Sequence, residues 1–429
     1  METHLADFIR NTPEGREAEA ILRACVHCGF CTATCPTYQL FGDELDGPRG
    51  RIYLIKQVLE GAEPGEKTRL HLDRCLTCRA CETTCPSGVH YGRLLDIGRA
   101  VVAAKLPRRG VEALTRTVLR ELLPRPRLFG SALKLGQQLR PLLPPLLRDK
   151  LPPSQPSVSR PHAQFARRML ALAGCVQPAL LPNVNAAGMR VLARLNIGLV
   201  EVAEAGCCGA VRMHLDDVEG ARRDARRNID AWWPHIERGA EAIVITASGC
   251  GVQVKDYGGL LRDDVRYAAK AGRVAALAKD IAEVVAAEAA LLKPLLALVR
   301  GGRRRVAFHS PCTLQHGLRI RGVVESLLAA AGCELVPVAD GHLCCGSAGT
   351  YSVLQPEIAG RLRDDKLAVL SAGGPQLIAS ANVGCIAHLQ SGSRLPVRHW
   401  IELIDERLCS VRPPTANRAK MAGQTGERP

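Results

Sequence analysis

Two similar runs of cysteines near the start of the sequence restrict the possible folds more than any other feature. Each run reads CxxCxxCxxxCP: CVHCGFCTATCP holds Cys25, Cys28, Cys31 and Cys35, and CLTCRACETTCP holds Cys75, Cys78, Cys81 and Cys85. Zinc sites favour two separated CxxC pairs over thiols crowded in this way, and a thiol cluster without metal would be oxidised or inert. The doubled run therefore favours iron-sulfur centres.

The spacing also predicts how the thiolates are shared. Three thiolates separated by two residues on a tight loop can reach three irons of one [4Fe-4S] cube, and the fourth then points to the other cube. We predict one cube on Cys25, Cys28, Cys31 and Cys85, and a second on Cys75, Cys78, Cys81 and Cys35. Neither cube has an open coordination position, which indicates electron transfer and not catalysis.

The residues around the two runs predict helices. Ile52, Ile55, Val58 and Leu59 recur at helical spacing between the runs, as do Leu94, Ile97 and Val101 after the second. The cysteine runs are those of ferredoxins with two clusters. Residues 1–100 resemble the all-helical ferredoxin domain of succinate dehydrogenase iron-sulfur subunits and not the compact β-rich ferredoxin.

The rest of the chain contains an internal repeat. The first copy carries Cys175, Cys207, Cys208 and Cys250, and the second carries Cys312, Cys344, Cys345 and Cys385. Each cysteine motif follows a short apolar run that predicts a strand, and helical segments lie between the runs. Alternating strands and helices predict an α/β domain with a parallel sheet for residues 166–298 and another for 299–412, with the cysteines of each copy at one sheet edge.

Each copy resembles the CCG, or cysteine-rich, domain of heterodisulfide reductase subunits and their relatives. In that family the pattern ends in CxxC and five cysteines can hold unusual iron-sulfur clusters. Here the ending is incomplete, because neither Cys250 nor Cys385 has a second cysteine three residues before or after it. A four-cysteine cluster, a redox-active pair at Cys207-Cys208 or Cys344-Cys345, a quinone-docking surface and inert thiols all stay open.

A few further residues could have a part in the second copy. His309, His316, His342 and His388 fall near its cysteine edge and could donate protons to a quinone, although such histidines are more often packed or solvated. Cys333 and Cys409 have no counterpart in the first copy and are interpreted as ordinary buried thiols. The tail, residues 413–429, is predicted to be disordered.

The charge of the chain is concentrated in one segment. The formal net charge is +15, and 14 Lys/Arg face 3 Asp/Glu between Val101 and Leu170. Many prolines interrupt this stretch, so residues 101–165 are interpreted as an interdomain linker. Its leucines and arginines could pack on neighbouring domains or form amphipathic helices on an anionic membrane or a partner. Aromatics are too rare here to favour nucleic acid.

No targeting or membrane-spanning segment is evident. The first twenty residues carry several charges, and the apolar stretch from Ile281 to Val299 is interrupted by Glu283, Glu288 and Lys293. We therefore expect a cytoplasmic location, where many free cysteines serve as metal or redox ligands.

The whole layout resembles the glycolate oxidase (glycolate dehydrogenase) iron-sulfur subunit family, most closely in CVHCGFCTATCPTYQLFGDELDGPRGRIYLIKQVLEG and SANVGCIAHLQSGSRLPVRHWIELID. The resemblance implies a subunit that takes electrons from a separate FAD-containing subunit oxidising glycolate to glyoxylate, and passes them to a quinone pool at the inner face of the cytoplasmic membrane. The absence of GxGxxG, P-loop and flavin motifs agrees with hydride chemistry on another chain.

Two alternatives stay open. The chain could be a heterodisulfide-reductase-like catalytic subunit in which the CCG motifs hold the reactive centre. It could also carry electrons for D-lactate or glycerol 3-phosphate dehydrogenase, because neither cluster motif identifies the donor.

Overall fold

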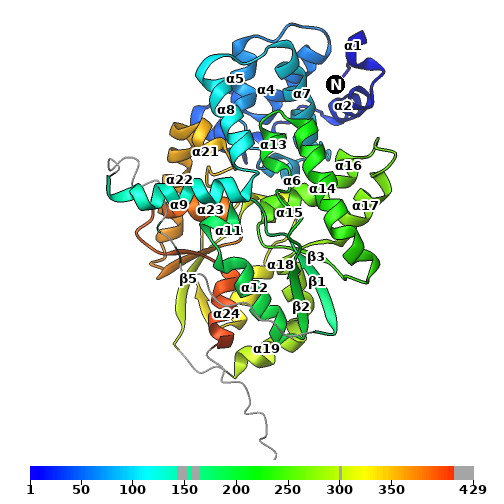
Figure 1. Cartoon of the computed structure of the whole chain (residues 1–429). Coiled ribbons are helices and arrows are strands. Elements are labelled where there is room, and N and C mark those ends of the chain that lie inside the picture. Colours follow the sequence, from blue (N-terminus) through cyan, green and yellow to red (C-terminus); the bar gives the residue numbers. More distant parts are fainter. Residues whose placement is uncertain (143–152, 154, 156–164, 299–301, 410–429) are drawn as a thin grey trace, which may run out of the picture.

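The computed structural model describes residues 1–142, 153, 155, 165–298 and 302–409. A helical module forms one end of the molecule, and two α/β units lie side by side beneath it (Figure 1). The predicted architecture, a helical domain followed by two α/β domains with parallel sheets, is confirmed. The predicted tail lies outside the described residues.

The helical module is built from short helices that pack around one apolar core. Its helices are α1 (Asp7–Arg10), α2 (Pro13–Ala24), α3 (Pro36–Phe41), α4 (Pro48–Leu59), α5 (Glu66–Asp73), α6 (Ala80–Thr84) and α7 (Tyr91–Lys105), with 3-10 turns η1 (Phe30–Thr32) and η2 (Glu44–Asp46). The helices predicted from periodicity are α4 and α7, which meet at Ile55 and Gly98. A Cβ on Gly98 would lie 2.6 Å from Ile55 Cγ1, so only glycine permits this close approach.

The two α/β units have the same sheet topology. The first sheet has the order β2-β1-β3-β4 and the second β6-β5-β7-β8, with every pairing parallel. The strands are β1 (Arg167–Ala171), β2 (Ile197–Glu201), β3 (Ile243–Ile245), β4 (Ala278–Asp280), β5 (Arg304–His309), β6 (Cys333–Leu335), β7 (Leu377–Ser380) and β8 (Val397–His399). The strands predicted before the cysteine motifs are present. The edge strands β4 and β8 were not predicted. Each has only three residues and includes a charged one, so neither forms an apolar run.

Helices cover both faces of each sheet. In the first unit they are α11 (Gln177–Leu180), α12 (Asn183–Arg194), α13 (Ala210–His214), α14 (Val218–Glu237), α15 (Ser248–Lys255), α16 (Tyr257–Leu260), α17 (Ala268–Leu277), α18 (Ile281–Ala287) and α19 (Ala289–Ala297). In the second they are the π-helix η4 (Thr313–Gly317), α20 (Val323–Ala330), α21 (Tyr351–Leu354), α22 (Pro356–Ser371), α23 (Val383–Gln390) and α24 (Trp400–Cys409).

The two units share one apolar core, so they pack against each other as one body. Alternate residues of β1 and β5 face this shared core, among them Met169 and Val306, whereas Leu170 faces a separate core inside the first unit. Arg190 of α12 also binds Asp405 of α24 through Nη2, at 2.6 Å. The shared core fixes the two cysteine edges relative to each other.

The side chain of His399 links the two units by hydrogen bonding to backbone atoms of each. Its Nε2 donates to the carbonyl oxygen of Thr246 at 2.8 Å, and its Nδ1 accepts from the Ile401 N–H at 3.2 Å, so the ring is neutral. Burial lowers the pKa of His399 from 6.5 to about 4. The unfolded chain therefore binds a proton at pH values where the folded chain does not. The stabilisation from this residue is complete above pH 6.5 and is lost as the pH falls toward 4.

We expect this difference to appear in unfolding experiments. From His399 alone, the free energy of unfolding should fall by about 1 kcal/mol between pH 7 and pH 5.5. A His399→Gln variant should lose that part of the pH dependence, as measured by anaerobic urea unfolding at the two pH values. Equal pH slopes in variant and wild type would contradict the assignment.

The basic segment after the module forms helices within its described part. Helix α7 passes the predicted boundary at residue 100, and α8 (Gly110–Leu122) and α9 (Pro126–Leu139) follow, before the 3-10 turn η3 (Arg140–Leu142). Arg108 and Arg116 bind Asp73 of the module and Asp216 of the first unit. Part of the charge excess therefore joins the module to the first unit.

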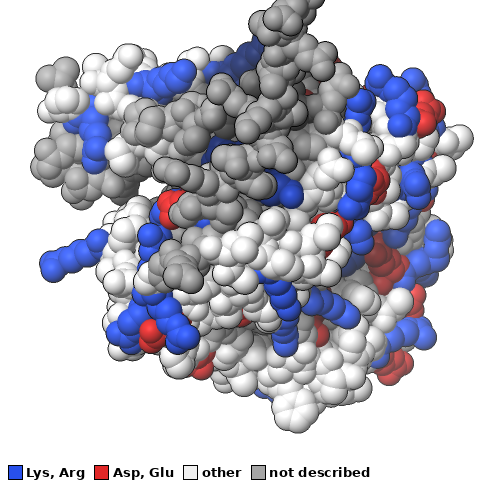
Figure 2. Space-filling model, turned by 90° about the horizontal axis from the view of Figure 1, so that it is seen from below, with Lys and Arg blue, Asp and Glu red and all other residues white. Residues whose placement is uncertain are grey.

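The outer side of α8 is apolar. Val111, Leu114 and Val118 are exposed, and no residue of this helix is buried. In the view of Figure 2, Lys and Arg are spread over the surface with Asp and Glu among them. Within the described part of the chain, no helix combines the length and apolarity needed to cross a membrane.

Candidate functional site: two thiol pockets and two cysteine edges

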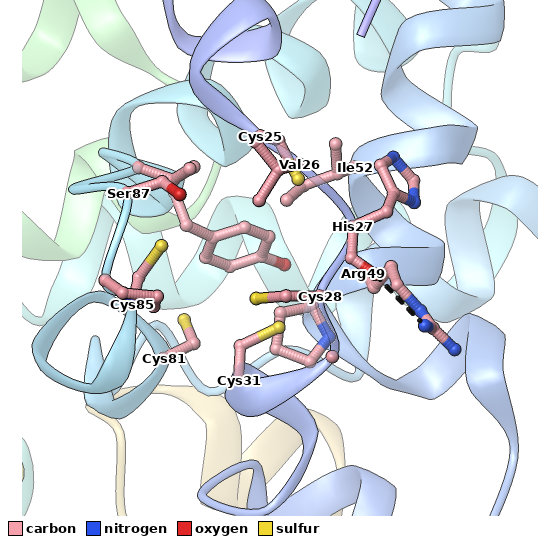
Figure 3. A pocket seen from close by; sticks show the side chains of 15 residues that line it. Cys25, Val26, His27, Cys28, Cys31, Arg49, Ile52, Cys81, Cys85 and Ser87 are labelled. Carbon is pink, nitrogen blue, oxygen red and sulfur yellow. Dashed lines mark hydrogen bonds between the residues drawn. The ribbon is translucent and has the colours of Figure 1, made fainter.

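A first pocket gathers thiols from both cysteine runs. Cys25, Cys28 and Cys31 line it from the first run, and Cys81 and Cys85 from the second. Figure 3 shows the sulfurs of Cys28, Cys31, Cys81 and Cys85 around one hollow. Cys28 is exposed, so this pocket reaches the surface. The fold thus places Cys85 of the second run beside the cysteines of the first run.

A second pocket lies directly beside the first. It is lined by Cys75, Cys78 and Cys81 of the second run and by Cys35 of the first. Tyr91 and Pro48 line both pockets. The Tyr91 hydroxyl donates to Cys75 Sγ at 3.6 Å. Cys81 also lines both pockets, so the two sets of thiols adjoin each other.

The two loops that carry the thiols have the same unusual backbone. His27 and Thr77 occupy matching positions in the two runs, with φ of 56° and 55°. Two residues later, Gly29 and Arg79 also match, with φ of 86° and 60°. Left-handed conformations in His, Thr and Arg cost energy and persist only where the surrounding structure requires them. Both loops are thus curled in the same way around their thiols.

Three of the pocket thiols, those of Cys31, Cys78 and Cys81, have a pKa raised by burial. Burial raises the pKa of Cys31 to about 11, and the nearby Cys25 adds to this effect. Burial likewise raises the pKa of Cys78, with a contribution from Cys312. Crowded, buried thiols become thiolates only when a cation compensates them, and metal coordination supplies that charge. The donor set and the loop shape therefore fit an iron-sulfur cube in each pocket.

A buried cation stands beside the second pocket. Arg51 is 1% exposed and lines this pocket. Its guanidinium donates to the His71 carbonyl oxygen at 2.7 Å and to Thr37 Oγ1 at 3.1 Å, and pairs with Asp46 at 3.3 Å. Burial opposes its charge, but the Cys75 thiolate and other anionic neighbours raise its pKa overall. Arg51 thus offsets negative charge from the thiolates.

The second copy's cysteine edge adjoins the second pocket. Cys312 Sγ lies 3.9 Å from Cys344 Sγ, and both pack with Cys78 in one apolar cluster. Thr83 Oγ1 and His316 Nδ1, 2.8 Å apart, link α6 to η4. Cys345 and Cys385 complete the set further inside. Thiols of the module and of the second unit are therefore near neighbours.

The first copy's cysteines also come together, in an apolar setting. Cys175, Cys207 and Cys208 are buried in one core, and Cys250 packs against it. Hydrogen bonds from the Cys175 and Cys208 thiols lower the pKa of Cys207, and the same contacts raise the pKa of Cys175 and Cys208. Asn228 Nδ2 donates to the Cys207 carbonyl oxygen at 2.8 Å and fixes the loop.

The remaining predicted residues have varied surroundings. His316 is bonded to Thr83, and His388 Nε2 contacts the Ala359 carbonyl oxygen at 3.1 Å, so both are engaged in packing. Cys333 is half-buried. The prediction that Cys409 is buried was wrong, because it ends α24 on the exposed side.

Sequence reasoning missed several residues at these sites. Arg51 and Tyr91 line the second pocket, and Lys366 of α22 lies near Cys344 and Cys345, but none of the three belongs to a motif and only the fold brings them to the cysteines. For Arg51 and Lys366 the one available signal was weak, a charged residue within an apolar helical pattern, and such residues are usually exposed.

Comparisons with known proteins agree with this arrangement. Residues 21–89 match the family model "4Fe-4S dicluster domain", and residues 169–255 and 306–390 match "Cysteine-rich domain". The chain is 54% identical to the glycolate oxidase iron-sulfur subunit of Escherichia coli, over 95% of this chain and 99% of the relative. It is 30% identical to a probable glycolate oxidase iron-sulfur subunit of Bacillus subtilis, over 90% and 92%.

A more distant relative covers only part of the chain. Lactate utilization protein A of Exiguobacterium is 24% identical over 54% of this chain and 94% of its own length. The likeness that extends over nearly the whole chain, together with paired thiol pockets and duplicated cysteine-rich units, decides the assignment: the chain belongs to the glycolate oxidase iron-sulfur subunit family and is an electron-transfer subunit.

Proposed function

We propose that the chain is the iron-sulfur subunit of a membrane-associated glycolate oxidase (dehydrogenase) complex. A flavin subunit on another chain would oxidise glycolate to glyoxylate, and this chain would carry the electrons toward quinone. The observation that carries the proposal is the likeness to the Escherichia coli subunit over 95% of the chain.

The spacing of the two runs and the lining of the two pockets together support a set of ligands for each cube, with Cys81 lining both pockets. We assign Cys25, Cys28, Cys31 and Cys85 to one cube and Cys35, Cys75, Cys78 and Cys81 to the other, a pairing that the pocket linings support. Each [4Fe-4S] cube takes up and releases one electron. The protein supplies the thiolates, the curled loops and the cation of Arg51.

The surface near Cys28 is suited to a redox partner. Val26 is 67% exposed and Phe30 61% exposed, and both lie in the loop that carries Cys28. Exposed apolar side chains beside a cofactor site are typical of transient protein contacts. The flavin subunit would dock here, at the end of the module where the first pocket reaches the surface.

Reduction of the native complex tests this function. The complex is purified with its flavin partner, and glycolate is added without oxygen. We expect glycolate to bleach the visible absorbance of the cubes and to generate their reduced EPR signal, whereas D-lactate and glycerol 3-phosphate reduce them more slowly. Reduction by one of the other donors but not by glycolate would overturn the proposed donor and leave the electron-transfer role intact.

The iron content separates this function from the catalytic alternative. Two cubes require about eight irons per chain. About twelve or more would instead favour a heterodisulfide-reductase-like role, in which a CCG unit holds a cluster of its own.

Membrane contact would use the apolar side of α8. Val111, Leu114 and Val118 share one side of this helix, and Arg109 is nearby, so the surface combines apolar and basic groups. We expect the complex to sediment with vesicles containing phosphatidylglycerol. Changing all three apolar residues to serine should weaken binding by about tenfold or more. A Val200→Ser/Val265→Ser control, also at exposed apolar positions, should bind as wild type does. Equal losses in both variants, or no vesicle binding by wild type, would contradict this contact.

A further inference from the structure

We propose that the second copy, and not the first, binds one metal ion of the zinc or iron class through His309, Cys345 and Cys385, with the neighbouring thiols completing its coordination. This site is separate from the two cubes of the proposed function. It does not depend on which donor feeds the complex.

The three ligand groups are already close together. One ring nitrogen of His309 and the Sγ atoms of Cys345 and Cys385 all lie within 4.8 Å of one another, and all three residues are buried. Ligands around a tetrahedral zinc or iron ion lie ~3.5–3.8 Å apart, so small side chain movements would complete the geometry. Thiolate and imidazole ligands together suit both metals.

The His309 ring has one nitrogen engaged and one free. Nδ1 lies 2.9 Å from Ser380 Oγ, whereas Nε2 is buried and has no hydrogen-bond partner. Leaving a buried polar atom unpaired costs about 1–3 kcal/mol, so its retention indicates a missing partner. Metal-binding histidines commonly hold their second nitrogen on an oxygen acceptor, as Nδ1 does on Ser380 here.

The first copy has apolar residues at the matching positions. The pairs Leu170–Ile243 and Ala307–Ile378 are equivalent in the two sheets. Two residues further along each strand lie Leu172 and Ile245 in the first copy, but His309 and Ser380 in the second. The first copy therefore has an apolar pair where the second has a ligand and the group that orients it.

The charge around the site differs in the same way. Ala221 and Ala359 make the same backbone contact to the glycine of each CCG motif, which aligns Asn228 of α14 with Lys366 of α22. Lys366 is 3% exposed, and its Nζ donates to the Asp340 carbonyl oxygen at 2.8 Å. Among the described residues it makes no ion pair with a carboxylate. A buried ammonium requires compensating negative charge, which metal-bound thiolates nearby would supply.

The position of the site gives it a connection to the cubes. Cys344, next to the ligand Cys345, packs with Cys78 of the second pocket. A metal at His309 would thus lie behind the thiols that separate the module from the second unit. Zinc there would hold these thiols in place, and iron there could exchange one electron with the cube of the second pocket.

Metal analysis of matched variants tests the proposal. Wild-type chain purified without oxygen is assayed for iron and zinc by mass spectrometry. We expect about one metal equivalent beyond the about eight irons of the cubes. Cys385→Ser should lose this equivalent and keep the cube irons. The matched Cys250→Ser variant, at the same position of the first copy, should keep both.

Two further variants test whether His309 is a ligand of the metal and whether Ser380 orients it. His309→Leu introduces the residue that the first copy carries at this position, so the fold should accept it, and it should lose the extra metal. Ser380→Ala should lower the affinity for that metal by about 10–100-fold in a chelator competition. Zinc in the wild type would indicate a structural ion, and a ninth iron a redox ion.

Three results would overturn this inference. They are a wild type with no metal beyond the cubes, a His309→Leu variant that keeps the extra metal, and equal loss in Cys250→Ser and Cys385→Ser. Fewer than about eight irons in a wild type that retains the extra metal would instead count against the two-cube function and leave this site standing.

Discussion

A Cys85→Ser variant is expected to retain about four irons per chain, and adding Cys25→Ser to it is expected to remove no more. Both residues line the first pocket although they belong to different cysteine runs. Loss of one ligand is expected to release the whole cube. Removing a second ligand of the same cube then releases no further iron. Combining Cys85→Ser with Cys75→Ser should instead abolish both cubes, because Cys75 lines the second pocket.

Iron analysis and EPR of the anaerobically purified variants measure this outcome. Cys333→Ser is a suitable control, because Cys333 lies in β6 outside both pockets, and it should retain about eight irons. If Cys85→Ser/Cys75→Ser kept four irons, each run would serve its own cube and the assigned pairing would be wrong. Non-additivity of this kind is the expected behaviour of residues that act as one unit.

Replacing Arg51 with methionine is expected to destabilise the module by about 3–5 kcal/mol, the usual effect of breaking a buried ion pair from one side. Asp46 would keep Arg74 and His71, but Thr37 Oγ1 and the His71 carbonyl oxygen would each lose a buried hydrogen bond. Loss of the positive charge should also lower the reduction potential of the cube in the second pocket, because the reduced, more negative form would lose its compensation.

Arg49→Met provides a control for stability on the same helix, and because Arg49 lines the first pocket, the potential is compared only for the cube of the second pocket. Arg49 pairs with Glu44 at 2.6 Å, with both side chains more than one third exposed, so its loss should cost about 0–1 kcal/mol. Anaerobic urea unfolding followed by circular dichroism measures the stability, and a redox titration followed by EPR measures the potential. Similar stabilities for the two variants would show that Arg51 does not have the structural role inferred here.

The sequence alone predicted the features that depend on regular spacing. The two CxxCxxCxxxCP runs predicted that thiols of both runs come together, as they do in the two pockets, and the assignment of each thiolate to a cube stays a prediction. Apolar periodicity predicted α4, α7 and the strands before each CCG motif, since these elements bury one face. The short edge strands β4 and β8 have no such pattern, and the exposure of Cys409 depends on which side of α24 meets the core.

Contacts between distant segments were decided only by the tertiary structure. The sequence determined two cysteine runs and a duplicated CCG frame, and it placed His309 near the second copy's cysteine edge without showing which of the cysteines it faces. The fold sets Cys312 and Cys344 against Cys78, and places His309 and Lys366 beside the second copy's thiols, where the first copy has Leu172 and Asn228. Spacing along a chain fixes local ligand sets, whereas the burial of a charge or an imidazole near them depends on packing between elements far apart in sequence.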